Sequence, residues 1–505
     1  MSSKAILSKF KIHYFLLIFV SNMAMGQSSP PNIVFFFVDD MGWQDTSVPF
    51  YERITELNKR YHTPNMERLA SEGMKFTQAY ASAVCSPSRV SWITGANAAR
   101  HQVTNWTLKR DQSPDGPDDI IQPPLWNVNG MTAGEDVPQT YPATPLPAIL
   151  RDHGYTTIHV GKAHWGAEGT PGAEPLNLGF DVNIGGHAAG GPGSYLGEHN
   201  YSAVWRNPGN HTWDVPGLEE FYGRDVYLNE ALTIKAKAEM DRAQDSGQAF
   251  FLYLSHYAIH APWEADPRFY DKYLAAGLTQ EEAIYASMIE SMDKSLGDIM
   301  SHLTERGLED NTIVVFMSDN GVHPNMPRNI PLRGHKLSPY EGGIRVPLLV
   351  KWPGISQPGS VNSAQVIIED VFPTVLEMAG IQDSQGLPSF DGESFVSQLR
   401  MPEKENTDRA LLWHYPHTYY NPPYTVLREG DWKLIFHYKE QGFELFNIAN
   451  DLSEQFNLAE QNSDKCRQMA ADMTALMKER GAQLPMLKPT MAPSPYPIEA
   501  FEARQ

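Results

Sequence analysis

One of the chain's two cysteines lies in a setting that suggests chemistry rather than packing. Cys85 opens the run CSPSR, residues 85–89, in a chain of 505 residues with only one other cysteine. Such a thiol can be a nucleophile, a metal ligand or half of a disulfide. The other, Cys466, shares a predicted helical face with apolar residues at 469, 470, 473 and 477, which indicates a buried apolar role. A disulfide between Cys85 and Cys466 is the alternative.

Four short apolar runs, each typical of a strand buried on both faces, end in polar side chains. The runs cover residues 32–40, 156–166, 249–260 and 312–321. The polar residues at their ends are Asp39 and Asp40, Lys162 and His164, His256 and His260, and Asp319 and Asn320. One polar strand end is ordinary, but four with complementary chemistry indicate a single assembled site.

The carboxylates at these strand ends predict a metal site. Asp39 and Asp40 are adjacent, and two unpaired buried carboxylates would repel each other and lose hydration. A divalent cation removes that cost, and Asp319 and Asn320 supply further oxygens from another strand end. An all-oxygen set suits Ca²⁺ or Mg²⁺ rather than zinc, with Cys85 beside it. The alternative is that the two aspartates only cap the turn after the strand.

Basic residues at other strand ends predict an anion site. Lys162 and His164 stand two positions apart, and the run LRGHKLSPYEGGIRVP, residues 332–347, adds Arg333 and Lys336. Such groups can hold an anion and transfer protons. Taken singly, each is more often a solvated or packed residue, so the prediction depends on their common placement.

Helices between the apolar runs position these side chains. Residues 62–73 predict a helix with Thr63 as N-cap, and residues 279–307 predict one that begins with a capping box of Thr279 and Glu282. The Met-rich stripe of the second helix is typical of core. Alternating strands and helices predict an α/β fold with a large, mostly parallel sheet sandwiched by helices, and ligands bind at the carboxyl ends of such strands.

The pattern of apolar and polar residues changes near residue 385. Short alternating segments between 411 and 460 predict an antiparallel meander, and residues 463–481 predict a helix. We therefore divide the chain into residues 1–26, a catalytic α/β domain at 27–385, and a smaller α+β subdomain at 386–505 that completes the substrate cleft.

Composition and the N-terminus predict an exported protein. The chain has 40 basic and 60 acidic residues, a net charge of −20, and no Lys/Arg-rich run, which argues against nucleic acid and anionic membranes as partners. Residues 1–26 read as a signal peptide, with basic residues before the apolar run at 14–20 and small residues at 24–26. The apolar run is too short to span a bilayer. We expect a periplasmic or secreted protein without a membrane anchor.

Together these motifs resemble the type I sulfatases, arylsulfatase-like members of the alkaline phosphatase superfamily. CSPSR with the later Thr-Gly resembles the family signature, and GKAHWG, SHYAIHAP, SDNG and LRGHKLSPYEGGIRVP resemble its other motifs. Two residues depart from the family pattern. Ile93 stands where Leu is usual, and His335 stands where Gly is usual.

The resemblance implies a mechanism. Cys85 would be oxidised to formylglycine (3-oxoalanine) by a formylglycine-generating enzyme, and its hydrate would attack the sulfate ester. It implies Ca²⁺, or Mg²⁺, held by Asp39, Asp40, Asp319, Asn320 and residue 85. Arg89, Lys162 and Lys336 would neutralise the sulfate. His164 would be the base and His260 the acid, with either role open to sharing by the lysines.

The expected substrate is a sulfated polysaccharide or its oligosaccharides. His414 and His417, in the aromatic run at 413–424, and His187, in the glycine-rich run at 185–197, are candidate sugar contacts. Subdomain packing is the alternative role of the first two. The rival functions are a phosphate or phosphonate monoester hydrolase of the same superfamily and an inactive protein that binds sulfated glycans.

Overall fold

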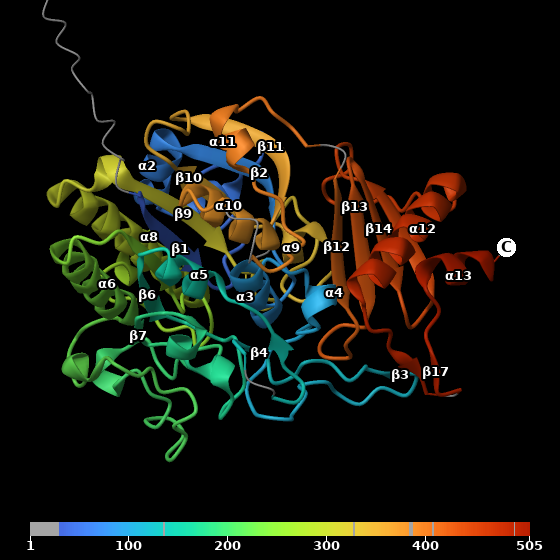
Figure 1. Ribbon diagram of the computed structural model, residues 1–505, viewed down its shortest axis with the longest axis horizontal. Coiled ribbons are helices and arrows are strands. Elements are labelled where there is room, and N and C mark those ends of the chain that lie inside the picture. Colours follow the sequence, from blue (N-terminus) through green and yellow to red (C-terminus); the bar gives the residue numbers. More distant parts are fainter. Residues whose placement is uncertain are drawn as a thin grey trace, which may run out of the picture.

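A computed structural model describes residues 30–134, 137–326, 329–382, 387–406, 409–488 and 490–504. The predicted signal peptide, residues 1–26, lies outside these ranges. Within them, no helix has both the length and the apolar character needed to cross a membrane. Figure 1 shows a larger unit built on one broad sheet and a smaller C-terminal unit beside it.

The larger unit is organised around an eight-stranded sheet of order β11-β2-β10-β9-β1-β8-β6-β7. The four predicted apolar runs form four consecutive strands of its parallel part, β9 (Thr312–Ser318), β1 (Asn32–Val38), β8 (Phe250–Ser255) and β6 (Thr156–Gly161). The other strands are β7 (Val182–Ile184), β10 (Leu348–Lys351), β2 (Met74–Tyr80) and β11 (Ser360–Ile367). Only β10 runs antiparallel to its neighbours, so the mostly parallel sheet is confirmed within the described ranges.

Strand β1 shows why these runs are apolar throughout. Its residues Ile33, Phe35 and Phe37 belong to the core on one face of the sheet, while Val34, Phe36 and Val38 belong to the core on the other. Successive side chains of a strand point to opposite faces, so a strand covered on both sides needs apolar residues at every position.

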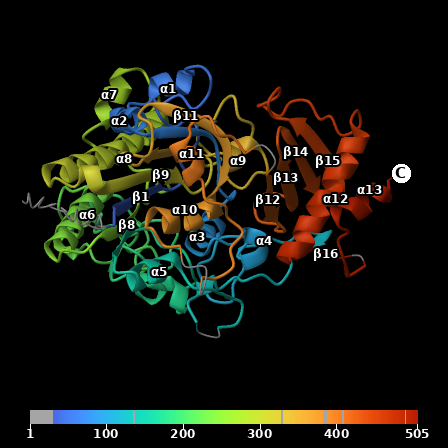
Figure 2. The ribbon, with the colours of Figure 1, turned by 45° about the horizontal axis from the view of Figure 1, so that its top comes forward.

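Helices cover both faces of the sheet (Figures 1 and 2). One face carries α2 (Pro64–Glu72), α6 (Leu228–Asp245), α7 (Tyr270–Ala275) and α8 (Gln280–Glu305). The other carries α3 (Cys85–Thr94), α5 (Leu146–Asp152) and α10 (Val371–Met378). Shorter helices are α1 (Glu56–Arg60), α4 (Ala98–His101), α9 (Glu341–Ile344) and α11 (Val396–Arg400). The predicted sandwich of helices around the sheet is confirmed.

The two predicted helices begin where expected, but their N-termini are capped by different side chains. The capping box of Thr279 and Glu282 is present at α8. At α2, the side chain of Thr63 makes no capping bond. Instead, the buried carboxylate of Asp293, on α8, accepts from the backbone N–H groups of Asn65 at 3.0 Å and Met66 at 2.8 Å. Thr63 is the N-cap residue, as predicted, but the acceptor for these N–H groups comes from a residue more than 200 positions away in sequence.

The C-terminal unit is an antiparallel sheet of β12 (Ala410–Tyr415), β13 (Tyr424–Glu429), β14 (Trp432–His437) and β15 (Gly442–Asn447), packed against α12 (Ser463–Arg480) and α13 (Pro497–Glu502). Cys466 is 1% exposed in the core between them, and neither cysteine forms a disulfide. The predicted α+β subdomain and the apolar role of Cys466 are confirmed.

Short strands pair locally around this frame. They are β3 (Ile121–Gln122), β16 (Met486–Leu487) and β17 (Ala492–Pro493) in one small sheet, and β4 (Met131–Thr132) and β5 (Tyr141–Pro142) in another. Helix α11 packs on α10, and Phe395 meets Phe76 edge to face at 5.4 Å. The segment that enters α11 therefore packs with the larger sheet, and the second sheet begins at Ala410.

Asp293 offers a test of the fold. We expect Asp293→Ala to lower the free energy of unfolding by about 1–3 kcal/mol, because two N–H groups at the start of α2 lose their acceptor. The matched control is Asp298→Ala on the same helix, whose carboxylate is partly exposed and pairs with Lys294. That change should cost less than about 1 kcal/mol. Urea unfolding of both variants measures the difference, and equal losses would contradict the capping role.

Candidate active site

Two adjacent strand ends bring the predicted carboxylates together. Asp39 and Asp40 follow β1, and Asp319 and Asn320 follow β9, which lies beside it. Carboxylate oxygens of Asp39, Asp40 and Asp319 and the sulfur of Cys85 all lie within 4.8 Å of one another. All of these residues are buried.

Helix α3 delivers Cys85 to this cluster. Cys85 is the first residue of the helix, so its side chain lies at the positive end of the helix dipole, where anions are favoured. One turn later, Arg89 is fully buried and donates to Asp319 Oδ2 from Nε at 3.0 Å and Nη2 at 2.8 Å. It also donates to Ser255 Oγ, at the end of β8, at 2.7 Å. Arg89 thereby fixes α3 against two strand ends.

Two lysines balance the other carboxylates. Lys162 Nζ, which follows β6, lies 2.5 Å from Asp39 Oδ2. Lys336 Nζ lies 2.5 Å from Asp40 Oδ1 and 3.0 Å from Cys85 Sγ. The three carboxylates and the three basic groups Arg89, Lys162 and Lys336 therefore form one buried network.

This network determines which groups carry charge. Burial raises the pKa of the Cys85 thiol to about 12 even though Lys162 and Lys336 oppose the shift. Burial also acts to raise the pKa of Asp40, but the charges of Lys336, His260 and Lys162 together outweigh it and hold that pKa well below its usual range. Burial opposes ionisation of Asp319 too, but the charges of Arg89, Lys162 and Lys336 together lower its pKa. Cys85 is therefore a thiol at neutral pH, while Asp40 and Asp319 are carboxylates.

The donor set fits a hard divalent cation. Asp40 Oδ2 and Asn320 Oδ1 are buried oxygens with no hydrogen-bond partner in the described parts of the chain. Unpaired buried oxygens are costly unless a ligand uses them. Oxygen atoms from three carboxylates and one amide match the preference of Ca²⁺ or Mg²⁺.

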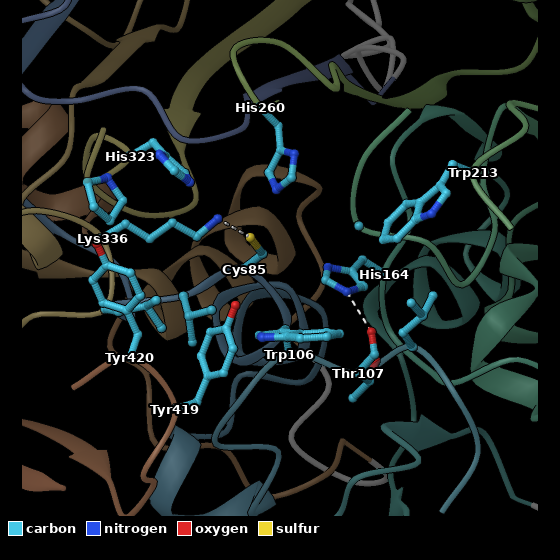
Figure 3. Close-up of a pocket in the computed structure, with 15 residues that line it drawn as sticks. Cys85, Trp106, Thr107, His164, Trp213, His260, His323, Lys336, Tyr419 and Tyr420 are labelled. Carbon is cyan, nitrogen blue, oxygen red and sulfur yellow. Dashed lines mark hydrogen bonds between the residues drawn. The ribbon is translucent and has the colours of Figure 1, made fainter. Parts of the chain in front are cut away.

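Two histidines face Cys85 from different sides (Figure 3). The ring of His164 donates from Nε2 to the Thr107 carbonyl at 2.8 Å, and its other nitrogen has no partner among the described residues. His260 donates from Nδ1 to the Ala261 carbonyl at 2.8 Å, and its Nε2 lies 3.9 Å from Asp40 Oδ2. Burial lowers the pKa of His260 to about 3 and that of His164 well below its usual range.

A glycine-rich loop holds both rings. A Cβ added at Gly190 would lie 2.4 Å from Cε1 of His164, and one at Gly191 would lie 2.8 Å from Nδ1 of His260. Both distances are too short for a real Cβ contact. The loop at 185–197 therefore contributes by close backbone approach to the two histidines.

Cys85 lies at the base of a cavity of about 360 Å³. Its walls are largely aromatic and imidazole, as Figure 3 shows, and the labelled lining residues are Cys85, Trp106, Thr107, His164, Trp213, His260, His323, Lys336, Tyr419 and Tyr420. Among the lining residues that the structure describes, Lys336 alone has a permanent charge. Arg89 and Lys162 lie behind the wall, bonded to Asp319 and Asp39.

Several predicted residues lie elsewhere. His414 bonds to Thr425 and to the Gln483 carbonyl, and His417 bonds to Thr104 and Asp115, so both brace the C-terminal unit. Neither these two nor His187 lines the cavity. The rings of His256 and His335 also bond away from the carboxylates.

The cavity also contains residues that the sequence did not single out, namely Trp106, Trp213 and His323. Tyr419 and Tyr420 come from the predicted aromatic run at 413–424, and they line the cavity in place of the two histidines named from that run. The clustering of tyrosines beside the two histidines was the sequence feature that could have predicted these two cavity residues. No local motif marks Trp106 or Trp213.

Comparison with known proteins explains this arrangement. The family model described as Sulfatase matches residues 31–381, more than half of the chain. The chain belongs to the sulfatase family. A second model, described as N-sulphoglucosamine sulphohydrolase, C-terminal, matches residues 335–483. The predicted membership of the type I sulfatases in the alkaline phosphatase superfamily is confirmed, and this sulfatase is a sulfuric ester hydrolase.

Relatives of this sulfatase include both bacterial and animal proteins. A Sulfatase of Formosa agariphila is 29% identical over 483 residues, covering 86% of this chain and 85% of that protein. The N-acetylgalactosamine-6-sulfatase of Canis lupus familiaris is 33% identical over 375 residues, covering 71% of this chain but only 64% of that enzyme. The solved structure of Ps i-CgsB in complex with k-i-k-neocarrahexaose has a TM-score of 0.71 and 25% identity, covering 89% of this chain and 93% of that one.

The close approach of Gly190 to His164 predicts a selective loss of activity. We expect Gly190→Ala to displace the His164 ring and to lower kcat for 4-nitrophenyl sulfate by about 10²-fold or more. The control is Gly442→Ala in β15, where a Cβ would meet its nearest neighbour at an ordinary 3.6 Å. Sulfate release and a thermal melt of each variant separate misplacement from unfolding. Full activity in Gly190→Ala would show that the loop does not position His164.

Proposed function

We propose that this sulfatase is exported and hydrolyses sulfate esters of a sulfated polysaccharide or its oligosaccharides, using a formylglycine at position 85 and a bound divalent cation. The observation that carries the proposal is the placement of Cys85. It lies at a helix start, at the base of the cavity, beside three carboxylates and a lysine.

The glycan substrate is supported by the walls of the cavity and by the names of relatives. Trp106, Trp213 and Tyr419 give flat apolar surfaces on which sugar rings can pack, and His323 and Tyr420 add polar groups. Related proteins are named N-acetylgalactosamine-6-sulfatase, and a related structure contains a neocarrahexaose.

The nucleophile follows from the state of residue 85. A thiol with a pKa of about 12 supplies little thiolate at neutral pH. We infer that a formylglycine-generating enzyme converts Cys85 during export. A two-electron oxidant used by that enzyme accepts two electrons from the Cβ–S unit, an oxygen at the oxidation level of water replaces sulfur as Cβ=O, and the sulfur leaves as hydrogen sulfide. Water adds to the aldehyde and leaves two hydroxyls on one carbon. One oxygen attacks sulfur and displaces the sugar oxygen, and loss of the proton from the other re-forms the aldehyde and expels sulfate.

Charged residues around the cavity base support this reaction. Asp39, Asp40, Asp319 and Asn320 would hold the cation together with residue 85. When bound, Ca²⁺ or Mg²⁺ would polarise sulfate oxygens and acidify the attacking hydroxyl. Lys336 lines the cavity and contacts the sulfate directly. Arg89 and Lys162 act through Asp319 and Asp39, whose side chains they hold in position.

The two histidines divide the proton transfers. One ring nitrogen of His164 has no hydrogen-bond partner among the described residues, and burial keeps the ring neutral by lowering its pKa, which suits a base that takes the proton from the second hydroxyl. His260 reaches the cavity with its Nε2, and the negative charge of a bound sulfate favours its protonated form. It then protonates the departing sugar oxygen.

The rival functions differ in one measurable property each. The Phosphonate Monoester Hydrolase of Agrobacterium radiobacter has a similar fold, with a TM-score of 0.59, but 19% identity. A phosphate or phosphonate esterase would release phosphate or phosphonate from its esters in preference to sulfate. An inactive glycan-binding protein would keep the thiol of Cys85. The buried network and the cavity histidines favour the sulfatase, because a binding protein needs no proton-transfer groups.

The central experiment combines mass and turnover. Protein expressed with a formylglycine-generating enzyme should show the aldehyde or its hydrate at position 85 by peptide mass spectrometry. It should release sulfate, but little phosphate, from paired nitrophenyl esters and from a panel of sulfated galactose and N-acetylgalactosamine sugars. Cys85→Ala should fold and be inactive. Full activity from a preparation that contains only unmodified Cys85, or no sulfate release from any ester, would overturn the proposal.

A thermal melt tests the cation without depending on activity. Ca²⁺ or Mg²⁺ should raise the Tm of the wild-type protein, because a ligand that binds only the folded state stabilises it. Asp40→Asn should abolish the shift by removing a carboxylate at the cluster, whereas Asp298→Asn on α8 should keep it. A wild-type Tm that neither ion moves, after chelation and dialysis, would argue against the site.

The role of His260 is tested by the leaving group. A sugar alkoxide needs protonation as it leaves, whereas a nitrophenolate needs little. His260→Ala should therefore slow sugar-sulfate hydrolysis by about 10²–10⁴-fold but nitrophenyl-sulfate hydrolysis far less. His164→Ala should slow both. Equal losses for both substrates in His260→Ala would transfer the acid role to Lys336, whose variant is tested in the same way.

A further inference from the structure

A second cavity adjoins the first across a shared wall. It has a volume of about 340 Å³, within the range of about 300–1,000 Å³ of small-ligand pockets. Tyr419 and Tyr420 line the first cavity, and the next residue, Asn421, lines the second. Leu337 joins them from the other side: it lines the first cavity, and its carbonyl accepts from Asn421 and Tyr424 in the second. The two cavities thus lie on either side of one loop.

The loop between the two cavities carries an exposed aromatic ring. Tyr420 is 60% exposed and has a positive φ of 62°, an unfavourable conformation for a tyrosine. His335 supports the ring edge to face at 5.9 Å. A raised, supported aromatic ring between two cavities is suited to pack against a sugar ring.

The second cavity has the opposite charge to the first. Its lining includes Tyr340, Tyr424, His437 and the carboxylates of Glu440 and Glu444, and no Lys or Arg among the described lining residues. His437 and the Tyr340 hydroxyl bond to Glu444, and these bonds hold the pKa of Glu444 below its usual value although burial opposes them. Glu444 is therefore an anion.

Nearby basic groups are already engaged. The guanidinium of Arg333 stacks 3.7 Å from the ring centre of Tyr340, and its Nη1 lies 3.5 Å from Glu444. Lys439 pairs with Asp118 at 2.7 Å. The side chain of Glu440 is exposed and forms no ion pair among the described residues, and Arg504 Nη2 donates to the Glu440 backbone carbonyl at 3.0 Å. The cavity thus presents acceptors for hydroxyl groups and repels a second sulfate or a carboxylate.

We propose that the two cavities form one extended site, in which the cavity beyond Tyr420 holds an uncharged sugar next to the sulfated one. The inference rests on the proposed function and narrows it. The preferred substrate is a glycan whose sulfated residue is followed by a neutral neighbour. Uronate-containing chains and chains sulfated on every residue are disfavoured.

The test uses a matched pair of disaccharides. The sulfated sugar that the ester panel selects is joined either to an unsulfated galactose or to a sulfated one, with both linkage orders made. In one of the two linkage orders, the wild-type kcat/KM should be about 10-fold or more higher for the disaccharide with unsulfated galactose than for the one with sulfated galactose. Glu440→Lys should reduce that ratio by about 5-fold or more, since a positive charge replaces a negative one. In the wild type, kcat/KM should be higher for the disaccharide with neutral galactose than for the sulfated monosaccharide. Tyr420→Ala should reduce this difference.

The controls separate this inference from the function on which it rests. Glu460→Lys makes the same charge change at an exposed position outside both cavities and should leave the ratio as in the wild type. Because the ratio is the readout, a general loss of activity does not mimic the result. A wild-type ratio near one, a preference for the sulfated neighbour, or equal ratios in Glu440→Lys and Glu460→Lys would overturn the inference. No sulfate release from any ester would overturn the function instead.

Discussion

The structure depends on keeping three carboxylates together away from water. Asp39, Asp40 and Asp319 lie within one small cluster at the ends of two strands, where their mutual repulsion and lost hydration oppose folding. Each has a basic partner: Lys162 for Asp39, Lys336 for Asp40 and Arg89 for Asp319. These partners come from three separate segments of the chain, so the network can form only when the whole larger unit is folded.

The features of the fold and the site that could be predicted are those determined by residues close together in sequence. The apolar runs at 32–40 and 312–321 are strands because every position is covered, and their carboxyl ends meet because parallel neighbours share an edge. That geometry was enough to place Asp40, Asp319 and their neighbours in one site. Cys85 was added by the resemblance of CSPSR to the sulfatase signature, and the structure shows that the start of α3 presents it at the same edge. The identity of the family then followed from motifs at these positions.

The parts that could not be predicted depend on contacts between distant segments. Asp293 caps α2 from another helix, and no pattern near Thr63 signals this. His414 and His417 had the right chemistry for sugar contact, but the strand β12 and the loop after it turn their rings toward Thr425 and Asp115. Side-chain type alone does not say which way a residue faces in a loop. For the same reason, Trp106 and Trp213 became candidates only when the cavity was seen.

The charge distribution shows how such a protein can select among polyanions. The chain has a net charge of −20, so a sulfated glycan is repelled at long range, and salt weakens that repulsion. In the first cavity, attraction comes from Lys336 and the start of α3. A sulfate that reaches this point is attracted locally, while each further sulfate on the same glycan adds to the repulsion by the net negative charge of the protein. An acidic surface around a small cationic base therefore favours sparsely sulfated chains, and the acidic cavity beyond Tyr420 extends that preference to the neighbouring sugar.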